Sequence, residues 1–87
     1  MRYGWNKINI SKEILGQMFI MDEENNHYLY TKGTGGFLWK AMEEPKTEEQ
    51  LVALSMENYH VDEKICRIEI RNFLEKMIKL KAIVEVE

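Results

Sequence analysis

The chain has 87 residues, of which 45% are hydrophobic, and it carries a formal net charge of −3. This length supports one domain with much of its surface in water, so a deep substrate cavity beside a core is not expected. The negative charge argues against a general nucleic-acid binder, because phosphate neutralisation needs clustered Lys and Arg. The single cysteine, Cys66, excludes an internal disulfide and suits a reducing cytosol. No apolar run is long enough for a membrane span and no secretory signal is present, so we expect a soluble cytoplasmic protein.

The first third of the chain is predicted to form a small antiparallel sheet. Loose alternation of apolar and polar residues permits a first strand within residues 1–16, where Trp5 is expected to pack in the core. Residues 16–21 and 27–31 are both β-prone, and the polar run 22–26 separates them. Such spacing predicts a hairpin.

The second strand of this hairpin has two distinct faces. His27, Leu29 and Thr31 share one face, whereas Tyr28 and Tyr30 share the other. A sheet of two or three strands must leave an edge, and an edge offers unpaired N–H and C=O groups to an extended peptide.

Helical segments follow the hairpin. A glycine-rich turn at 33–36 leads into a first helix, predicted from residue 35 or 36 to 44 and ended by Pro45. The second helix is predicted to begin at the capping box formed by Thr47 and Gln50 and to reach about residue 59.

Residues 63–81 are predicted to form the third helix, with Asp62 as its N-cap. The alternating tail at 82–87 is predicted to be a short strand. The broad core arc of the third helix contains Cys66, Ile70, Phe73, Leu74, Met77 and Leu80.

A second arc of the same helix, about 150° away, is also largely apolar. It consists of Val61 (just before the helix), Ile65, Ile68 and Asn72, and it is flanked by Lys64, Arg67 and Arg71. One interpretation is a binding groove whose cations meet an acidic ligand. The other is that the isoleucines pack against the sheet or Trp5 and that the cations form a solvated face.

The sequence shows no set of residues that catalysis or metal binding would need. His27 and His60 are isolated, and no Cys/His spacing resembles a zinc site. Cys66 is on the core arc, and the glycine-rich turn lacks the spacing of a phosphate-binding loop. We therefore expect neither an enzyme nor a bound cofactor or metal.

The order of these parts resembles the PqqD-like family. A hairpin leads into T-x-x-x-x-W at 34–39, and a k-T-x-E-x-L segment follows at 46–51. Next come Y-x-V-(D/E) at 59–62 and F-L-x-x-(M/L) at 73–77. The resemblance covers about residues 14 to 84. The chain departs from the family pattern at 79–83, where the family more often has a Gly, and in its glycine-rich turn.

The resemblance implies an α+β, winged helix-turn-helix-like fold, a three-stranded antiparallel sheet followed by three helices. It also implies binding of the leader segment of a ribosomally synthesised precursor peptide, and its presentation to a maturation enzyme such as a radical-SAM protein or a lasso-peptide protease. In that family the leader adds as a strand to the third strand and lies against the third helix. The matching positions are His27, Tyr28, Leu29, Tyr30 and Thr31, and then Val61, Ile65, Ile68 and Asn72 with Arg67 and Arg71.

These positions coincide with the exposed edge and the second arc, so both fit strand addition with side-chain pockets. On this hypothesis Ile65 and Ile68 select apolar leader side chains, Arg67 or Arg71 select acidic ones, and Ile68→Asp weakens binding without unfolding the chain. Two alternatives remain at this stage. One is a winged-helix transcription regulator, supported by the cations of the third helix. The other is an obligate homodimer in which the isoleucine stripe is the subunit interface.

Overall fold

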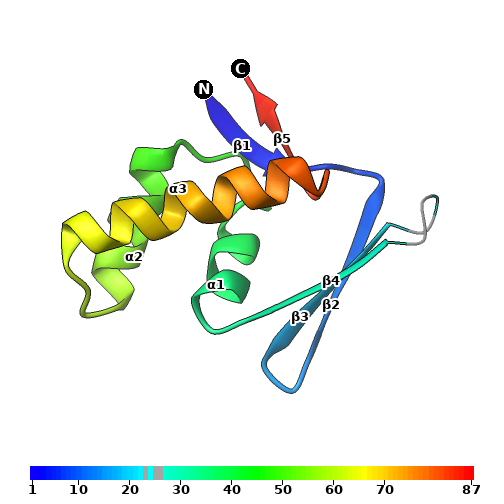
Figure 1. Ribbon diagram of the computed structural model, residues 1–87, viewed down its shortest axis with the longest axis horizontal. Helices are drawn as coiled ribbons and strands as arrows, with labels where there is room; N and C mark the ends of the chain where they lie inside the picture. Colours follow the sequence, from blue (N-terminus) through cyan, green and yellow to red (C-terminus); the bar gives the residue numbers. More distant parts are fainter. Residues whose placement is uncertain (23, 25–26) are drawn as a thin grey trace.

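A computed structural model of the chain describes residues 1–22, 24 and 27–87 (Figure 1). It contains five strands and three helices within this described part. In chain order they are β1 (Arg2–Trp5), β2 (Asn9–Ile14), β3 (Gln17–Asp22), β4 (His27–Lys32), α1 (Thr34–Ala41), α2 (Glu48–Asn58), α3 (Glu63–Lys79) and β5 (Ile83–Val86).

Strands β2, β3 and β4 form an antiparallel sheet in that spatial order. The predicted hairpin is confirmed, with Ile20 opposite Leu29 and Asp22 opposite His27. Of the predicted turn 22–26, Asp22 belongs to β3, and residues 23, 25 and 26 lie outside the described residues. The predicted three-stranded antiparallel sheet and three helices are therefore confirmed.

The N-terminal region differs from the prediction of one strand, because it forms two. The first of them, β1, pairs antiparallel with β5, so Arg2 lies opposite Val86 and the two chain ends are neighbours (Figure 1). Tyr3 also exchanges backbone hydrogen bonds with Lys46, at 2.7 and 2.9 Å. Strand β1 therefore pairs with the C-terminal tail and not with the hairpin, whereas β2 pairs with β3.

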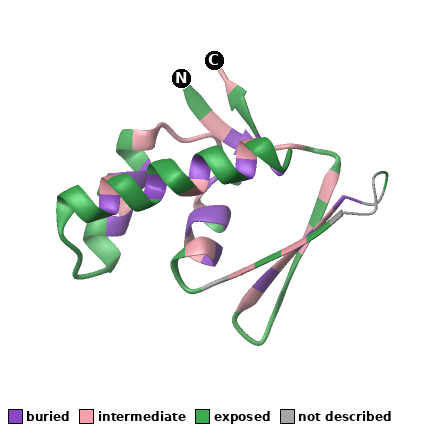
Figure 2. Cartoon of the chain, in the orientation of Figure 1, coloured by how far each residue is buried: buried purple, intermediate pink, exposed green. Residues whose placement is uncertain are grey.

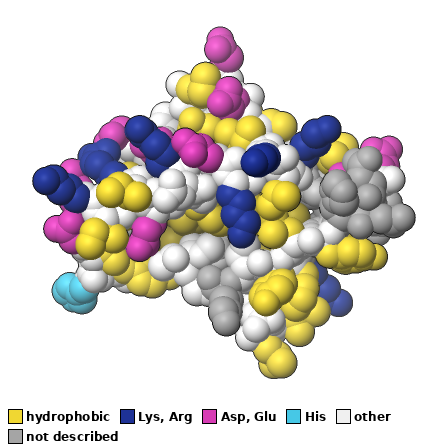
Figure 3. All heavy atoms as spheres, in the orientation of Figure 1, with side chains coloured by type: hydrophobic (Ala, Val, Ile, Leu, Met, Phe, Trp, Pro, Cys, Tyr) yellow, Lys and Arg dark blue, Asp and Glu magenta, His cyan; other side chains and the backbone are white. Residues whose placement is uncertain are grey.

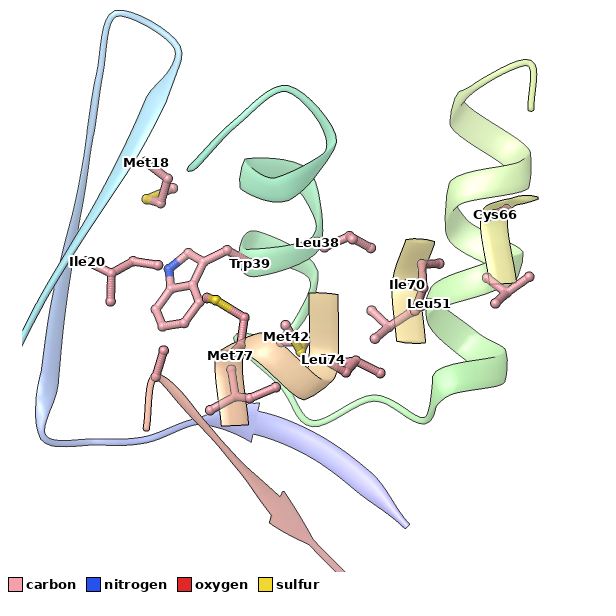
Figure 4. Packing of buried hydrophobic residues seen from close by; sticks show 13 residues of the cluster. Met18, Ile20, Leu38, Trp39, Met42, Leu51, Cys66, Ile70, Leu74 and Met77 are labelled. Carbon is pink, nitrogen blue, oxygen red and sulfur yellow. The ribbon is translucent and has the colours of Figure 1, made fainter. Parts of the chain in front are cut away.

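Trp5 joins this small second sheet to the core, as expected. Its ring stacks on Trp39 of α1 with centroids 5.0 Å apart, and its Nε1–H donates to the Trp39 carbonyl at 2.8 Å. Trp39 itself is 1% exposed. Figure 4 shows Trp39 pointing from α1 toward Ile20 of the sheet, whereas Leu38 points the opposite way, toward Ile70 of α3. Helix α1 thus fills the space between the sheet and the other helices.

Helix α1 starts one residue earlier and ends three residues earlier than predicted. Among the glycines of the turn at 33–36, only Gly33 has a positive φ (61°), and the helix begins at the next residue, Thr34. Gly35 is required for another reason, because a Cβ there would lie 2.9 Å from the Cβ of Thr31. The helix ends at Ala41, with Met42 as its C-cap, and the proline at position 45 disfavours helical geometry at Glu44.

The capping predictions for the other two helices are confirmed. Thr47 Oγ1 accepts from the Gln50 amide at 3.0 Å, and Gln50 Oε1 accepts from the Thr47 amide at 2.8 Å. At the start of α3, Asp62 Oδ2 accepts from the Ile65 amide at 3.2 Å. The helix ends at Lys79, before the predicted residue 81, because the Ala82 amide donates back to the Met77 carbonyl and closes the last turn.

The core arc of α3 is largely confirmed. Cys66, Ile70, Leu74 and Met77 are buried, whereas the outer side of the helix is exposed (Figure 2). Leu80 is the exception at 43% exposure, because it follows the end of the helix. In α2, Leu51 and Val52 are buried, whereas Met56 is 38% exposed and Tyr59, the C-cap residue, is 37% exposed.

Candidate functional site

The outer edge of β4 has no strand beside it among the described residues. Its one strand partner is β3, because β1 pairs with β5 instead. Tyr28 and Tyr30 lie on the outer face of the sheet and are 78% and 59% exposed. Tyr30 stacks on Phe19 of β3, with ring centroids 5.9 Å apart, and this cross-strand contact packs the edge strand β4 against β3. Every second residue of such an edge directs an N–H and a C=O outward.

The opposite face of β4 is directed toward the helices. Leu29 and Thr31 lie opposite Ile20 and Met18, which are both buried, so these four side chains share the inner face. The side chain of His27 lies outside the described part of the structure. A strand added to β4 would therefore send alternate side chains toward α3.

Helix α3 carries the predicted second arc in exposed form. Ile65 and Ile68 are 53% and 61% exposed, Val61 is 38% exposed, and Asn72 is exposed. The isoleucines are therefore not sealed against the sheet or Trp5. Ile65 precedes buried Cys66 by one residue, about 100° around the helix, whereas Ile68 lies two residues from both Cys66 and Ile70, about opposite the buried side.

Two hollows lie beside α3 at the two ends of β4. The first, the α1 hollow, has a volume of about 160 Å³ and is lined by Thr34, Gly35, Val61, Cys66, Glu69 and Phe73, among others. The second, the sheet hollow, has a volume of about 340 Å³ and is lined mainly by Ile20, Asp22, Leu29, Leu80 and Ala82. Figure 3 shows apolar side chains gathered between α3 and the sheet on this face. We call the β4 edge, the two hollows and the Ile65 side of α3 the β4–α3 surface.

Three acidic residues engage the predicted arginines. Arg67 pairs with Glu49 of α2 at 2.5 Å and with Glu63 at 3.0 Å, and Arg71 pairs with Glu48 of α2 at 3.0 Å. Hydrogen bonding to Arg67, and then its positive charge, hold the pKa of Glu49 below its ordinary value. Hydrogen bonds to Glu49 and Glu63 raise the pKa of Arg67 above its ordinary value. Both arginines thus fasten α3 to α2.

The structure brings some predicted residues together and separates others. Arg67 follows Cys66 on the α2 side of α3, so Ile65, which precedes Cys66, is on the opposite side. The β4 residues and Val61 lie along the β4–α3 surface with Ile65 and Asn72. Lys64 is exposed near the outermost line of the helix, with Ile68. Selection of acidic side chains by Arg67 or Arg71 stays a prediction.

Sequence reasoning missed four contributors to this surface: Asp22, Glu69, Phe73 and Leu80. Phe73 and Leu80 were placed on the core arc, and their partial exposure depends on where the sheet lies. Asp22 was assigned to the turn. Its position at the end of a strand with alternate buried residues (Met18, Ile20) was the available signal.

A catalytic or metal-binding site would need clustered ionisable side chains within the described residues. No three His, Cys, Asp or Glu side chains gather there as metal ligands. Cys66 is 4% exposed. None of the described helices combines the length and apolarity that crossing a bilayer would require.

Comparison of the sequence with protein-family models gives one family for this chain. The model for "Coenzyme PQQ synthesis protein D (PqqD)" matches residues 17–83, from the start of β3 to the start of β5. The chain belongs to the PqqD family. The resemblance in the sequence motifs is thereby confirmed.

Two solved structures share the fold of this PqqD-family chain. One is described as TbiB1 in complex with the TbiA(beta) leader peptide, with a TM-score of 0.87 and 19% identity over 97% of this chain and 98% of that one. The other is a lasso peptide synthetase B1 complexed with the leader peptide, with a TM-score of 0.86 and 8% identity over 98% and 100%. Curated protein sequences gave no match to the chain.

Proposed function

We propose that this PqqD-family protein binds the leader segment of a ribosomally synthesised precursor peptide and presents it to a maturation enzyme. The leader adds as a strand to the outer edge of β4, and its inward side chains enter the β4–α3 surface. The protein contributes recognition and positioning, and the chemistry belongs to the partner, such as a radical-SAM protein or a lasso-peptide protease.

The observation that carries the proposal is the open edge of β4. The N-terminal strand β1 would be the obvious internal cover, but it pairs with β5. Main-chain hydrogen bonds to such an edge give affinity that tolerates many sequences, and adjacent pockets give selectivity. The two hollows lie where alternate side chains of an added strand would point. The two leader-peptide complexes with the same fold support this reading.

The peptide side chains suited to most of this surface are apolar. Val61 and Phe73 line the α1 hollow, and Ile65 offers an exposed apolar side chain on the same side of α3. Covering such surface is favourable by about 25 cal/mol per Å². Binding of DNA by α3 is disfavoured, because Arg67 and Arg71 are already paired with carboxylates.

The decisive experiment is a backbone N-methyl scan. Synthetic fluorescein-labelled leaders, taken from any short precursor-like reading frames found among the neighbouring genes, are titrated with the full chain in fluorescence anisotropy. Strand addition predicts that N-methylation of every second leader residue weakens binding about tenfold or more, while the residues between tolerate it. A scan without period-two alternation would reject strand addition.

Two controls identify the site and the class of ligand. NMR of the ¹⁵N-labelled chain should place the largest amide shifts on β4 and on the Ile65 side of α3, and smaller ones on α2. A DNA duplex should leave the spectrum unchanged even at low salt. Low salt is the sensitive condition, because nonspecific DNA binding is strongest at low ionic strength. Shifts concentrated on β2, the other edge of the sheet, would reject the β4 assignment.

A further inference from the structure

One carboxylate on the β4 side of α3 is without a partner. Glu69 is exposed, and among the residues that line the α1 hollow its side chain is the one that is charged at neutral pH. It makes no hydrogen bond or ion pair with any described residue, whereas Glu48, Glu49 and Glu63 are each paired with an arginine. A carboxylate left open beside a peptide-binding edge favours a cationic group of the ligand.

The position of Glu69 on α3 separates it from the arginines of the same helix. Arg67 and Arg71 are each two residues away, about 200° around the helix, and both are paired with other carboxylates. Ile65 and Phe73 are each four residues away, so they lie on the same side of the helix as Glu69. Helix α3 thus directs its arginines toward α2 and its unpaired carboxylate toward the β4–α3 surface.

We propose that Glu69 selects a lysine or arginine of the bound peptide, whose cationic end lies at the Glu69 carboxylate while its aliphatic stem covers Val61 and Phe73. This inference rests on the proposed function, because it requires a peptide strand beside β4. It assigns the peptide a charge opposite to the one that Arg67 or Arg71 would select.

The lining of the α1 hollow suits such a side chain. Its buried members Leu38, Cys66 and Ile70 are apolar, whereas Val61 and Glu69 are exposed at its mouth. Lysine and arginine bury an aliphatic stem along apolar surface while the charged head stays in water. Because Glu69 is exposed, the pair forms at the mouth of the hollow and avoids the desolvation cost of a buried ion pair.

The mouth of the hollow adjoins the end of β4. Gly35 lines the hollow, and a Cβ added there would lie 2.9 Å from the Cβ of Thr31. Thr31 is opposite buried Met18 and is thus an inward-facing residue of β4. An inward side chain of an added strand, at the level of Thr31, would therefore begin beside the hollow. We expect the selected cation at one fixed position of the peptide.

The test uses a random dodecapeptide display library selected on the full chain, and NMR shifts on β4 identify the selected peptides that bind there. We expect these peptides to share a Lys or Arg at one position. Replacing that residue with norleucine (for Lys) or citrulline (for Arg) should weaken binding to the unaltered chain about three- to tenfold. The same replacement should cost less than about twofold with Glu69→Gln, as in a double-mutant cycle. Selection on Glu69→Lys should give Asp or Glu at that position instead.

The matched control is Glu75→Gln, on the same helix. It removes one negative charge from an exposed residue that lines a different hollow, together with Tyr3 and Glu85. General attraction between an acidic protein and a cationic peptide would respond equally to Glu69→Gln and Glu75→Gln. We expect Glu75→Gln to keep the full three- to tenfold effect. Thermal melts of both variants should match the unaltered chain, because both side chains are exposed.

Each other outcome overturns the inference. An equal effect of the peptide replacement in the unaltered chain and in Glu69→Gln would mean that the cation is bound elsewhere. A cation that is still selected by Glu69→Lys would mean the same. Peptides that bind at β4 without a shared cation would remove the selectivity and leave strand addition intact. If no selected peptide shifts β4, strand addition itself fails, and the role of Glu69 fails with it.

Discussion

Truncation of Ile65 tests most directly whether the Ile65 side of α3 faces the bound peptide. Its side chain is 53% exposed in the uncovered protein, so a peptide lying on the β4–α3 surface can still bury about half of it. Full burial of an isoleucine gains about 1.5–3 kcal/mol, so covering the exposed half gains about 1–1.5 kcal/mol. Ile65→Ala should therefore raise the Kd for the leader about five- to tenfold.

The matched control is Ile68→Ala, three residues further along the same helix. Ile68 is 61% exposed but lies about opposite the buried side of α3, so a peptide beside β4 covers less of it. We expect its Kd to change less than about twofold, and Ile68→Asp to weaken binding by less than Ile65→Asp. Isothermal titration calorimetry measures both variants, and urea unfolding checks that both are folded. Equal losses at the two positions would mean that the peptide crosses the outer surface of α3, and no loss at Ile65 would refute the site.

Three further predictions concern the scaffold that holds this surface. Trp5→Ala removes the stack on Trp39 and the 2.8 Å hydrogen bond to its carbonyl, so the free energy of unfolding in urea should fall by about 2–3 kcal/mol, whereas Trp5→Phe should lose less. Thr47→Ala removes half of the capping box, which should cost about 1 kcal/mol and lower the Tm by about 4–8 °C in a calorimetric scan. Arg67 lowers the pKa of Glu49, so the ion pair stabilises the fold at pH values above 4.5, the ordinary pKa of a glutamate. This contribution is lost as the pH falls through the lowered pKa of Glu49. Glu49→Gln should thus shift the urea midpoint slightly at pH 7 and by less as the pH is lowered toward 3, and an equal shift at both would contradict the pairing.

Local signals in the sequence predicted the hairpin, the three helices and the starts of the second and third helices. The capping residues Thr47 and Asp62 act within three or four residues, so they mark helix starts without any knowledge of the fold. Alternation in β3 and β4 likewise identified the hairpin and its two faces. The exposed stripe at Ile65 and Ile68 was visible in the helical period, and the family resemblance supplied its expected use.

Other features depended on contacts between distant parts of the chain. Whether β1 covers β4 or pairs with β5 is a choice between segments far apart in sequence, and short-range alternation is the same in both cases. The pairing of Arg67 with Glu49 of α2, and the closure of an apolar wall around Asp22, likewise require the helices and the sheet to be placed.

The sequence by itself thus determined the helices, the hairpin and the second apolar stripe of α3, because propensity, capping and periodicity are properties of neighbouring residues. Tertiary structure alone decided that the edge of β4 is left open and that Asp22 lies in the wall of the sheet hollow. The physical reason is that an edge is open or closed according to which other strand gains more by pairing, and that outcome is settled across the whole fold.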